Sequence, residues 1–156
     1  MDAVDVLAAR YRKLAVEQAK TANPEEKRIL NRITQALQIV PKSPPNDFFS
    51  AVQSFFLIYT FDGVDSPGRF DQYMGDYYDS ADPKEAIEIL EGLWIAFHDM
   101  RAWNLCIGGS DQDYNDQSNA LSYAILDITK RMGFQTPNLT LRWHKNLPDS
   151  LLKSAV

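Results

Sequence analysis

The six residues 111–116 offer the most recognisable chemistry, because their alternating carboxylate and amide side chains resemble the start of a calcium-binding loop. Such a loop has Gly at its sixth position and Glu at its twelfth, where this chain has Asp116 and Ser122. We therefore interpret the segment as a polar turn in which Asp116 caps the helix that follows.

The remaining side chains suited to metal binding or nucleophilic attack are two histidines and one cysteine. His98 and His144 have no further ligand at a useful spacing, so the sequence predicts no metal site. His144 follows a predicted strand, where parallel α/β folds bind ligands, and this makes it a pocket candidate. Cys106 lies inside a predicted strand rather than at a helix start or beside a base, which favours a buried apolar filler over a nucleophile.

Gly108 and Gly109 stand between a predicted strand and a predicted helix, which is where phosphate-binding loops occur. The sequence has neither a GxGxxG nor a GKS or GKT motif, and the polar residues 110–116 separate the glycines from the helix. A tight backbone turn explains the two glycines better. The residues by themselves therefore predict no catalytic set.

The elements that would position these residues begin with two amphipathic helices over 1–39. Apolar residues recur every three or four positions from 2 to 22 and again from 24 to 40. Asn23 and Pro24, followed by two glutamates, are typical of a helix start. The short link between the helices predicts an antiparallel helical hairpin.

Residues 40–101 are predicted to form buried helices. Three prolines in 41–45 exclude a helix there. Asp47 then caps a helix that is apolar on most sides and must therefore be enclosed by other elements. A short aromatic helix follows the loop 62–68, and a helix led by proline with one apolar stripe spans 83–101.

Residues 102–156 change character and are predicted to form a βαβ unit and a truncated helix. Short strands at 104–107 and 139–143 flank a helix at 117–132, so the strands are expected to be parallel. Two strands cannot bury both faces of a sheet, and the helix that opens at 148 stops after about two turns. We therefore expect further strands and helices downstream.

The composition limits the partners and the location. A net charge of −5 argues against nucleic acid, because binding to phosphates needs a basic patch. One cysteine allows no internal disulfide, and the longest mostly apolar run, 55–61, is too short to span a bilayer. With no signal peptide visible, we expect a cytoplasmic protein without a membrane partner.

Five stretches, in order from about residue 40 onward, resemble segments of the glycyl radical enzymes of the pyruvate formate-lyase type. They are VPKSPP with FFSAVQSFF in 40–56, GRFDQY at 68–73 with YY at 77–78, NLCIGG at 104–109, NDQSNALSY at 115–123 and PNLTLRWHKNLPD at 137–149. Together these motifs are specific to that family.

This resemblance implies a helix-rich α/β fold that is a partial segment of a ten-stranded α/β barrel. In such enzymes a glycyl radical near the C-terminus oxidises a cysteine at the barrel centre to a thiyl radical, which reacts with a small-molecule substrate. A separate iron-sulfur activating enzyme that uses S-adenosylmethionine makes the glycyl radical. Neither the Gly-Cys loop nor the RV.GY-type glycine segment occurs in this chain, and Cys106 falls on a threonine position of the family. No residue here is therefore predicted to be catalytic.

The resemblance also indicates which residues would lie near a substrate pocket. Relatives that dehydrate diols carry His-Ser where this chain has Gly63 and Val64, which argues against a diol of that type. Trp103 stands just before a strand, where the family often places an aromatic residue near substrate. The segment between the helix 83–101 and that strand is shorter here than in many relatives, which implies a divergent member or an altered pocket. The pocket candidates are Gly63, Val64, Trp103, Cys106 and His144.

Two hypotheses follow. In the first, the chain is a structural portion of a radical-based lyase, dehydratase or acyltransferase of anaerobic metabolism, such as a formate acetyltransferase, and is inactive by itself. This hypothesis predicts an exposed apolar sheet edge and a tendency to self-associate. In the alternative, the chain is a standalone helical binding or scaffold protein derived from the same family. A cooperative melt without exposed hydrophobic surface would favour that alternative.

Overall fold

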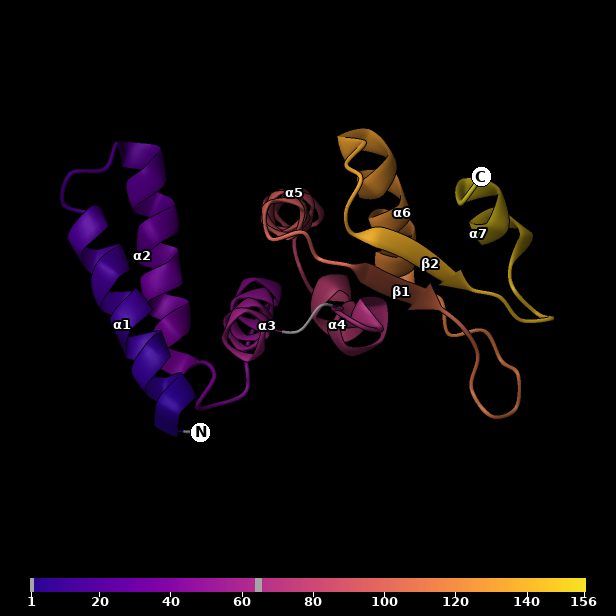
Figure 1. Cartoon of the computed structure of the whole chain (residues 1–156), viewed down its shortest axis with the longest axis horizontal. Coiled ribbons are helices and arrows are strands. Elements are labelled where there is room, and N and C mark those ends of the chain that lie inside the picture. The colour runs from indigo at the N-terminus through magenta and orange to yellow at the C-terminus, as the bar shows by residue number, and fades with distance from the viewer. Residues whose placement is uncertain (1, 64–65) are drawn as a thin grey trace. The chain divides into compact units, whose positions relative to one another are not determined.

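The computed structural model describes residues 2–63 and 66–156, which form a helix-rich α/β protein (Figure 1). The chain divides into two compact units, residues 1–63 and residues 64–156. In its described part the first unit contains helices only, whereas the second combines helices with a two-stranded sheet.

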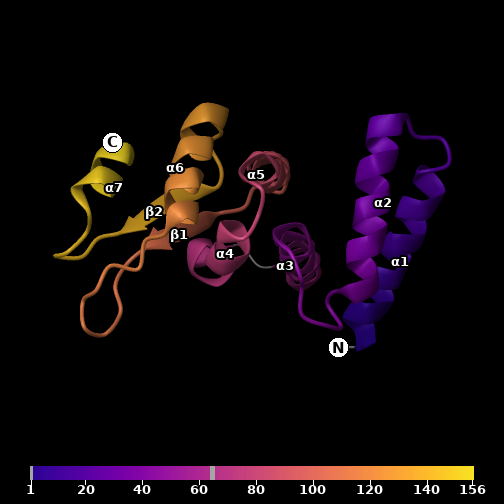
Figure 2. The ribbon, with the colours of Figure 1, turned by 180° about the vertical axis from the view of Figure 1, so that it is seen from behind.

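The first unit consists of α1 (Asp2–Gln18), α2 (Pro24–Ile39) and α3 (Phe48–Asp62). The helices α1 and α2 lie side by side as the predicted hairpin (Figures 1 and 2). The end of α1 at Gln18 corrects the predicted end at residue 22. The chain tightens into turns there, because the N–H groups of Lys20 and Thr21 donate to carbonyls only three residues back.

Side-chain caps confirm the predicted starts of α2 and α3. Asn23 Oδ1 accepts hydrogen bonds from the backbone N–H groups of Glu25 and Glu26 at 3.0 Å, and the Glu26 carboxylate accepts one from the Asn23 N–H at 3.1 Å. Asp47 accepts from the Ser50 N–H at 2.7 Å. These bonds satisfy N–H groups that have no partner inside a helix.

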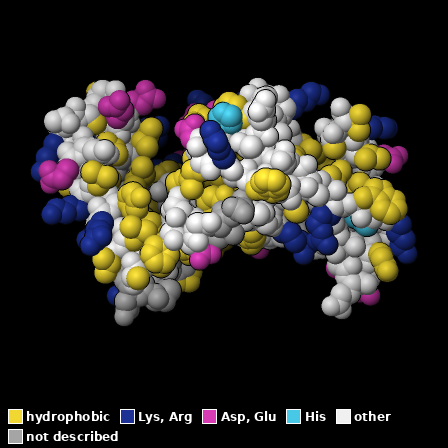
Figure 3. All heavy atoms as spheres, in the orientation of Figure 1, with side chains coloured by type: hydrophobic (Ala, Val, Ile, Leu, Met, Phe, Trp, Pro, Cys, Tyr) yellow, Lys and Arg dark blue, Asp and Glu magenta, His cyan; other side chains and the backbone are white. Residues whose placement is uncertain are grey.

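The buried core of the first unit takes residues from all three helices and from the turn after α2: Ala8, Leu37, Val40 and Leu57. The predicted enclosure of α3 is incomplete within the described residues, because Ile58 is 47% exposed and Phe61 51% exposed. Hydrophobic side chains are accordingly visible on the surface of this unit (Figure 3).

The second unit, in its described part, contains four helices and two strands. They are α4 (Phe70–Asp79), α5 (Pro83–Asp99), β1 (Asn104–Gly108), α6 (Ala120–Met132), β2 (Asn138–Arg142) and α7 (Asp149–Ser154). The strands are parallel, with Asn104 opposite Asn138 and Gly108 opposite Arg142, and α6 connects them. This arrangement confirms the predicted βαβ unit.

The core of the second unit lies between the sheet and its helices (Figures 1 and 2). Leu105 and Ile107 of β1 are fully buried, and so are Leu121 and Ile125 of α6. The predicted apolar stripe of α5 is buried along its whole length: Ala86, Leu90, Leu93, Trp94 and Phe97. None of the helices in the described residues combines the length and the apolar character that a membrane span requires.

The start of α6 at Ala120 corrects the predicted start at residue 117. Asn119 caps this helix, because its Oδ1 accepts from the Ser122 N–H at 3.1 Å and Ser122 Oγ accepts from the Asn119 N–H at 3.0 Å. The predicted cap, Asp116, uses its carboxylate to bind Ser118 and His144 instead. It therefore lies outside the helix.

Candidate functional site

One face of the two-stranded sheet is polar. Asn104 and Cys106 of β1 share this face with Thr140 of β2, because alternate residues of paired strands point to the same side. Thr140 Oγ1 donates to Asn104 Oδ1 at 2.9 Å, and Asn104 Nδ2 lies 3.6 Å from Cys106 Sγ. The opposite face carries the fully buried Leu105 and Ile107. The sheet is therefore apolar toward its helices and polar on the other side.

Cys106 is half-buried on the polar face, which corrects the prediction that it is a buried apolar filler. Leu105 and Ile107 take the core-facing positions on either side of it, so Cys106 must face the other way. The amide of Asn104 beside its sulfur is neutral and cannot take the thiol proton. The geometry thus places this thiol on the polar face beside a neutral amide.

The segment 66–68 lies along one edge of β1. The Cys106 N–H donates to the Gly68 carbonyl at 2.8 Å, and Gly68 forms a parallel bridge with Leu105. Ser66 Oγ donates to the Asn104 carbonyl. One edge of the sheet is therefore covered by the chain. Within the described residues, β2 has a strand neighbour on one side only.

Asp71 is a fully buried carboxylate that joins α4, β1 and α6. Its Oδ2 accepts from the Gly108 N–H at 2.7 Å and from Ser122 Oγ at 2.6 Å. Its backbone carbonyl accepts from Asn119 Nδ2 at 2.8 Å. Asp71 therefore fixes the carboxyl end of β1 against the start of α6.

Gly75 on α4 makes room for this network. A Cβ at that position would lie 2.6 Å from Asn119 Nδ2, which is closer than real Cβ atoms approach a neighbour. The absence of a side chain lets Asn119 reach the carbonyl of Asp71.

The turn after β1 is the predicted tight turn. Gly108 has φ of 65° and Gly109 has φ of 100°, values that favour glycine. A Cβ on Gly109 would lie 2.8 Å from Arg142 Nη1. The Arg142 side chain therefore lies close over the turn, at the carboxyl end of both strands.

His144 is buried beyond the end of β2 and holds the loop before α6. Burial by itself raises the pKa of Asp116, but hydrogen bonds from Ser118 and His144 outweigh burial, and the net pKa is lowered. The ionised Asp116 can only accept, so His144 Nε2 donates to its Oδ1 at 3.0 Å. His144 thus ties β2 to the loop through a charged acceptor.

The segment that resembles a calcium loop is closed by its own hydrogen bonds. Asp111 Oδ1 accepts from the N–H groups of Asp113 and Asn115 at 2.9 Å, and the Asn115 side chain donates to Oδ2. These bonds, above all the one from the Asn115 side chain, lower the pKa of Asp111. In the part of the chain that the structure describes, no group of three or more acidic, His or Cys side chains is arranged to hold a metal ion.

The predicted pocket residues are spread over the fold. Trp103 is 69% exposed before β1, and its carbonyl accepts from the Asn138 N–H at 2.9 Å. His144 follows the opposite end of the sheet, so the structure does not bring these two side chains together. Gly63 ends α3 with φ of 67° in the first unit, and Val64 lies outside the described residues.

Sequence reasoning missed the buried network around Asp71. The available signal was its position on α4, where the buried residues are Phe70, Asp71, Met74 and Gly75. An acid and a glycine four residues apart on a buried helix stripe indicate a close polar contact with a neighbouring element.

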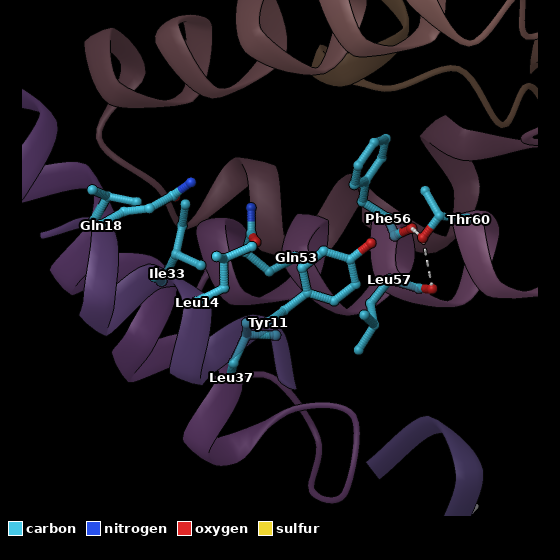
Figure 4. Close-up of a pocket in the computed structure, with 11 residues that line it drawn as sticks. Tyr11, Leu14, Gln18, Ile33, Leu37, Gln53, Phe56, Leu57 and Thr60 are labelled. Carbon is cyan, nitrogen blue, oxygen red and sulfur yellow. Dashed lines mark hydrogen bonds between the residues drawn. The ribbon is translucent and has the colours of Figure 1, made fainter. Parts of the chain in front are cut away.

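A separate apolar groove lies within the first unit, with a cavity volume of about 220 Å³. Each of its three helices contributes residues spaced three or four apart, among them Tyr11 and Leu14 of α1, Ile33 of α2, and Gln53 and Phe56 of α3 (Figure 4). None of the described residues that line it is charged, and none of the predicted pocket residues that the structure describes is among them.

Comparison with known proteins identifies the family. All of residues 1–156 match the family model described as pyruvate formate lyase-like. The chain is 30% identical to the isethionate sulfite-lyase of Desulfovibrio desulfuricans over 97% of its own length, and 27% identical to the trans-4-hydroxy-L-proline dehydratase of Clostridioides difficile over 99%. A solved glycyl radical enzyme from Archaeoglobus fulgidus matches 98% of the chain with a TM-score of 0.86 and 30% identity. The chain belongs to the pyruvate formate lyase-like family of glycyl radical enzymes.

The chain spans 22% of that sulfite-lyase, 23% of that dehydratase and 23% of the solved archaeal chain. The alignment with the sulfite-lyase runs over 182 residues, although this chain has 156. The relative therefore contains residues within the aligned region that this chain lacks.

Proposed function

We propose that these 156 residues serve as a structural portion of a glycyl radical enzyme that acts on a small molecule as a lyase or dehydratase. The observation that carries this proposal is the match of 98% of the chain to a solved glycyl radical enzyme. The matched sulfite-lyase and dehydratase support this reaction class, and acyl transfer of the formate acetyltransferase type remains a further option within the family.

In this proposal β1 and β2 are two strands of a ten-stranded barrel, and their polar face lines its interior. The half-buried Asn104 and Cys106 on one face, against fully buried residues on the other, suit this orientation. The free edge of β2 would receive the next strand. The division into a hairpin (1–39), buried helices (40–101) and a βαβ unit (102–156) would then describe parts of one larger domain.

Trp103 stays a pocket candidate, because its side chain is 69% exposed just before β1. Cys106 would face the same interior. Gly63 and Val64 stay candidates by resemblance to the family. We assign His144 a positioning role through Asp116, which would keep the loop at the carboxyl end of the strands in place.

The radical chemistry would come from elsewhere in the protein. The Gly-Cys loop and the radical glycine segment of the family do not occur in these residues, so we propose that this chain by itself is inactive. An activating enzyme with an iron-sulfur cluster and S-adenosylmethionine would install the glycyl radical in the whole protein, in the cytoplasm of an anaerobic cell.

Anaerobic activation followed by electron paramagnetic resonance tests this proposal. The 156-residue chain, incubated with a glycyl radical activating enzyme, S-adenosylmethionine and a reductant, should give no glycyl radical doublet. A longer product of the same gene that includes the radical glycine should give one. A doublet from the short chain, or substrate turnover by it, would contradict the proposal.

A further inference from the structure

The polar face of the sheet carries hydrogen-bond donors and one cation but no acidic side chain. Residues that pair across parallel strands point to the same side, so every second position of each strand belongs to this face. Its side chains are those of Asn104, Cys106, Asn138, Thr140 and Arg142. The charge on this face is therefore positive, although residues 64–156 as a whole contain more acids than bases.

Neighbouring side chains hold the amide of Asn104 in one orientation on this face. Thr140 Oγ1 donates to Asn104 Oδ1 at 2.9 Å, and Asn104 Nδ2 lies 3.6 Å from Cys106 Sγ. An asparagine side chain has one carbonyl acceptor and two N–H donors. Thr140 already donates to the carbonyl oxygen, whereas the second N–H of Nδ2 has no partner among the described residues. Asn104 therefore presents a donor to a ligand.

Cys106 adds a second, weaker donor next to this amide. Its sulfur accepts from Asn104, which leaves its S–H group to donate elsewhere. Both side chains are half-buried, so a ligand can reach them while part of the surrounding water is excluded, and this strengthens a hydrogen bond. Asn104 also stands between two of the predicted pocket residues, directly after Trp103 and two positions before Cys106.

We propose that Asn104 is a specificity-determining residue that donates to an oxygen of the substrate, and that this face selects small organic anions. This role rests on the proposed function, in which the polar face lines the interior of the enzyme. Hydrogen bonds to an anionic oxygen are about twice as strong as those to a neutral one. An ammonium group has donors only, so it would meet the donors of Asn104 and Cys106 without an acceptor and would be repelled by Arg142.

Three probe compounds that differ at one end test the selection of anions. Glycolate, ethylene glycol and ethanolamine share a short hydroxyl-bearing skeleton and end in a carboxylate, a hydroxyl and an ammonium group. Their binding is measured by isothermal titration calorimetry on the longer product of the same gene, before radical formation, so that no turnover occurs. Glycolate should bind about tenfold or more tightly than ethylene glycol, and ethanolamine should bind most weakly.

An isosteric charge variant tests the role of Asn104 itself. Asn104→Asp replaces the donor Nδ2 by an anionic acceptor oxygen of the same shape. It should weaken glycolate binding about tenfold or more and strengthen ethanolamine binding, which inverts the preference. Gln112→Glu is the matched control, because it makes the same change of amide to carboxylate at an exposed loop position outside the sheet, and it should leave the preference unchanged.

A second pair of variants tests the orientation of the amide without changing Asn104. Thr140→Val removes the hydroxyl that donates to Asn104 Oδ1 and keeps a strand-forming side chain. The amide then loses its fixed orientation, and the preference for glycolate over ethylene glycol should shrink about threefold or more. Thr140→Ser retains the hydroxyl and should retain the preference.

Failure of glycolate to bind more tightly than ethylene glycol would overturn this role of the polar face. An Asn104→Asp variant that weakens the binding of all three compounds alike would also overturn it, because that result indicates a structural effect only. A longer product that forms the glycyl radical doublet but shows either result leaves the proposed function standing. A longer product without the doublet would overturn the proposed function itself, whichever compound binds best.

Discussion

Different kinds of interaction stabilise the interior of each of the two units of this chain. Residues 1–63 contain eight Lys and Arg against seven Asp and Glu, whereas residues 64–156 contain eight against fourteen. In the first unit the helix caps are local and the core is a set of apolar stripes. In the second unit, buried hydrogen bonds join residues far apart in sequence, such as Asp71 with Gly108 and Ser122. Removal of a buried polar side chain should therefore lower the stability of the second unit most. Removal of a buried apolar side chain should be the change to which the first unit is most sensitive.

The three tryptophans make this comparison measurable, because Trp94, Trp103 and Trp143 all lie in the second unit. Tryptophan fluorescence during urea unfolding reports that unit selectively, while circular dichroism reports the helices of both.

Removal of the buried carboxylate should have the largest effect. Asp71→Ala leaves the Gly108 N–H and the Ser122 hydroxyl without their acceptor, and hydrogen bonds to charged groups contribute about 1.5–3 kcal/mol each. We expect the free energy of unfolding read by tryptophan fluorescence to fall by about 3 kcal/mol or more. Asp71→Asn keeps one acceptor oxygen and should lose about half as much. Equal stability of Asp71→Ala and the wild type would show that the hydrogen bonds of Asp71 do not stabilise the second unit.

A cavity in the first unit should rank second. Leu57 is buried in its core, so Leu57→Ala should lower the free energy of unfolding by about 2–3 kcal/mol, the low end of the usual range, because the groove is already open on one side. Circular dichroism should detect this loss. The neighbouring Ile58 is 47% exposed, and Ile58→Ala should change stability by less than about 1 kcal/mol. Similar losses for both variants would show that α3 is covered on the Ile58 side.

Two glycine substitutions sharpen the comparison further. Gly75→Ala forces the Asn119 side chain away from Asp71 and should destabilise the second unit by about 1–2 kcal/mol. Gly92→Ala lies in an exposed part of α5 with nothing near the new Cβ, so it should stabilise the same unit by about 0.5–1 kcal/mol. Urea unfolding followed by fluorescence compares the pair directly. We expect the two variants to change the free energy of unfolding in opposite directions. A change in the same direction for both would contradict the packing of Asn119 on Gly75.

The smallest effect should be a pH dependence at Asp116. Its pKa is lowered in the folded chain from the ordinary value of 3.8, since hydrogen bonds from Ser118 and His144 outweigh burial. A carboxyl of this kind stabilises the fold above its unfolded pKa, and that contribution is lost as pH falls through the folded pKa. The stability difference between wild type and Asp116→Asn should therefore shrink as pH falls below about 4. A difference that stays constant down to about pH 3 would show that the carboxyl has no lowered pKa.

Much of the fold could be predicted from the sequence because the signals were local. The proline and cap residues placed the starts of α2, α3 and α5, and the apolar stripe of α5 named the residues that are buried. The predicted start of α6 was wrong because two nearby residues compete for the role of helix cap. Asp116 and Asn119 can both cap a helix, but the Asp116 carboxylate binds Ser118 and His144 instead, and His144 lies twenty-eight positions away.

The candidate site was harder to predict because it depends on contacts between distant segments. The motif GRFDQY marked residues 68–73 as part of the family, but nothing local shows that Asp71 accepts from a glycine thirty-seven positions later. The predicted burial of Cys106 was wrong for a related reason. Strand alternation decides on which face of the sheet its side chain lies only once Leu105 and Ile107 are known to face the helices.

The most direct test of the central claim is to read the gene past the codon for Val156. We predict that the reading frame continues into a Gly-Cys loop and then an RV.GY-type segment with the radical glycine, so that these residues supply structure and the rest supplies the chemistry. A stop codon directly after Val156 would contradict it, and would leave a protein of glycyl radical enzyme ancestry that works by binding.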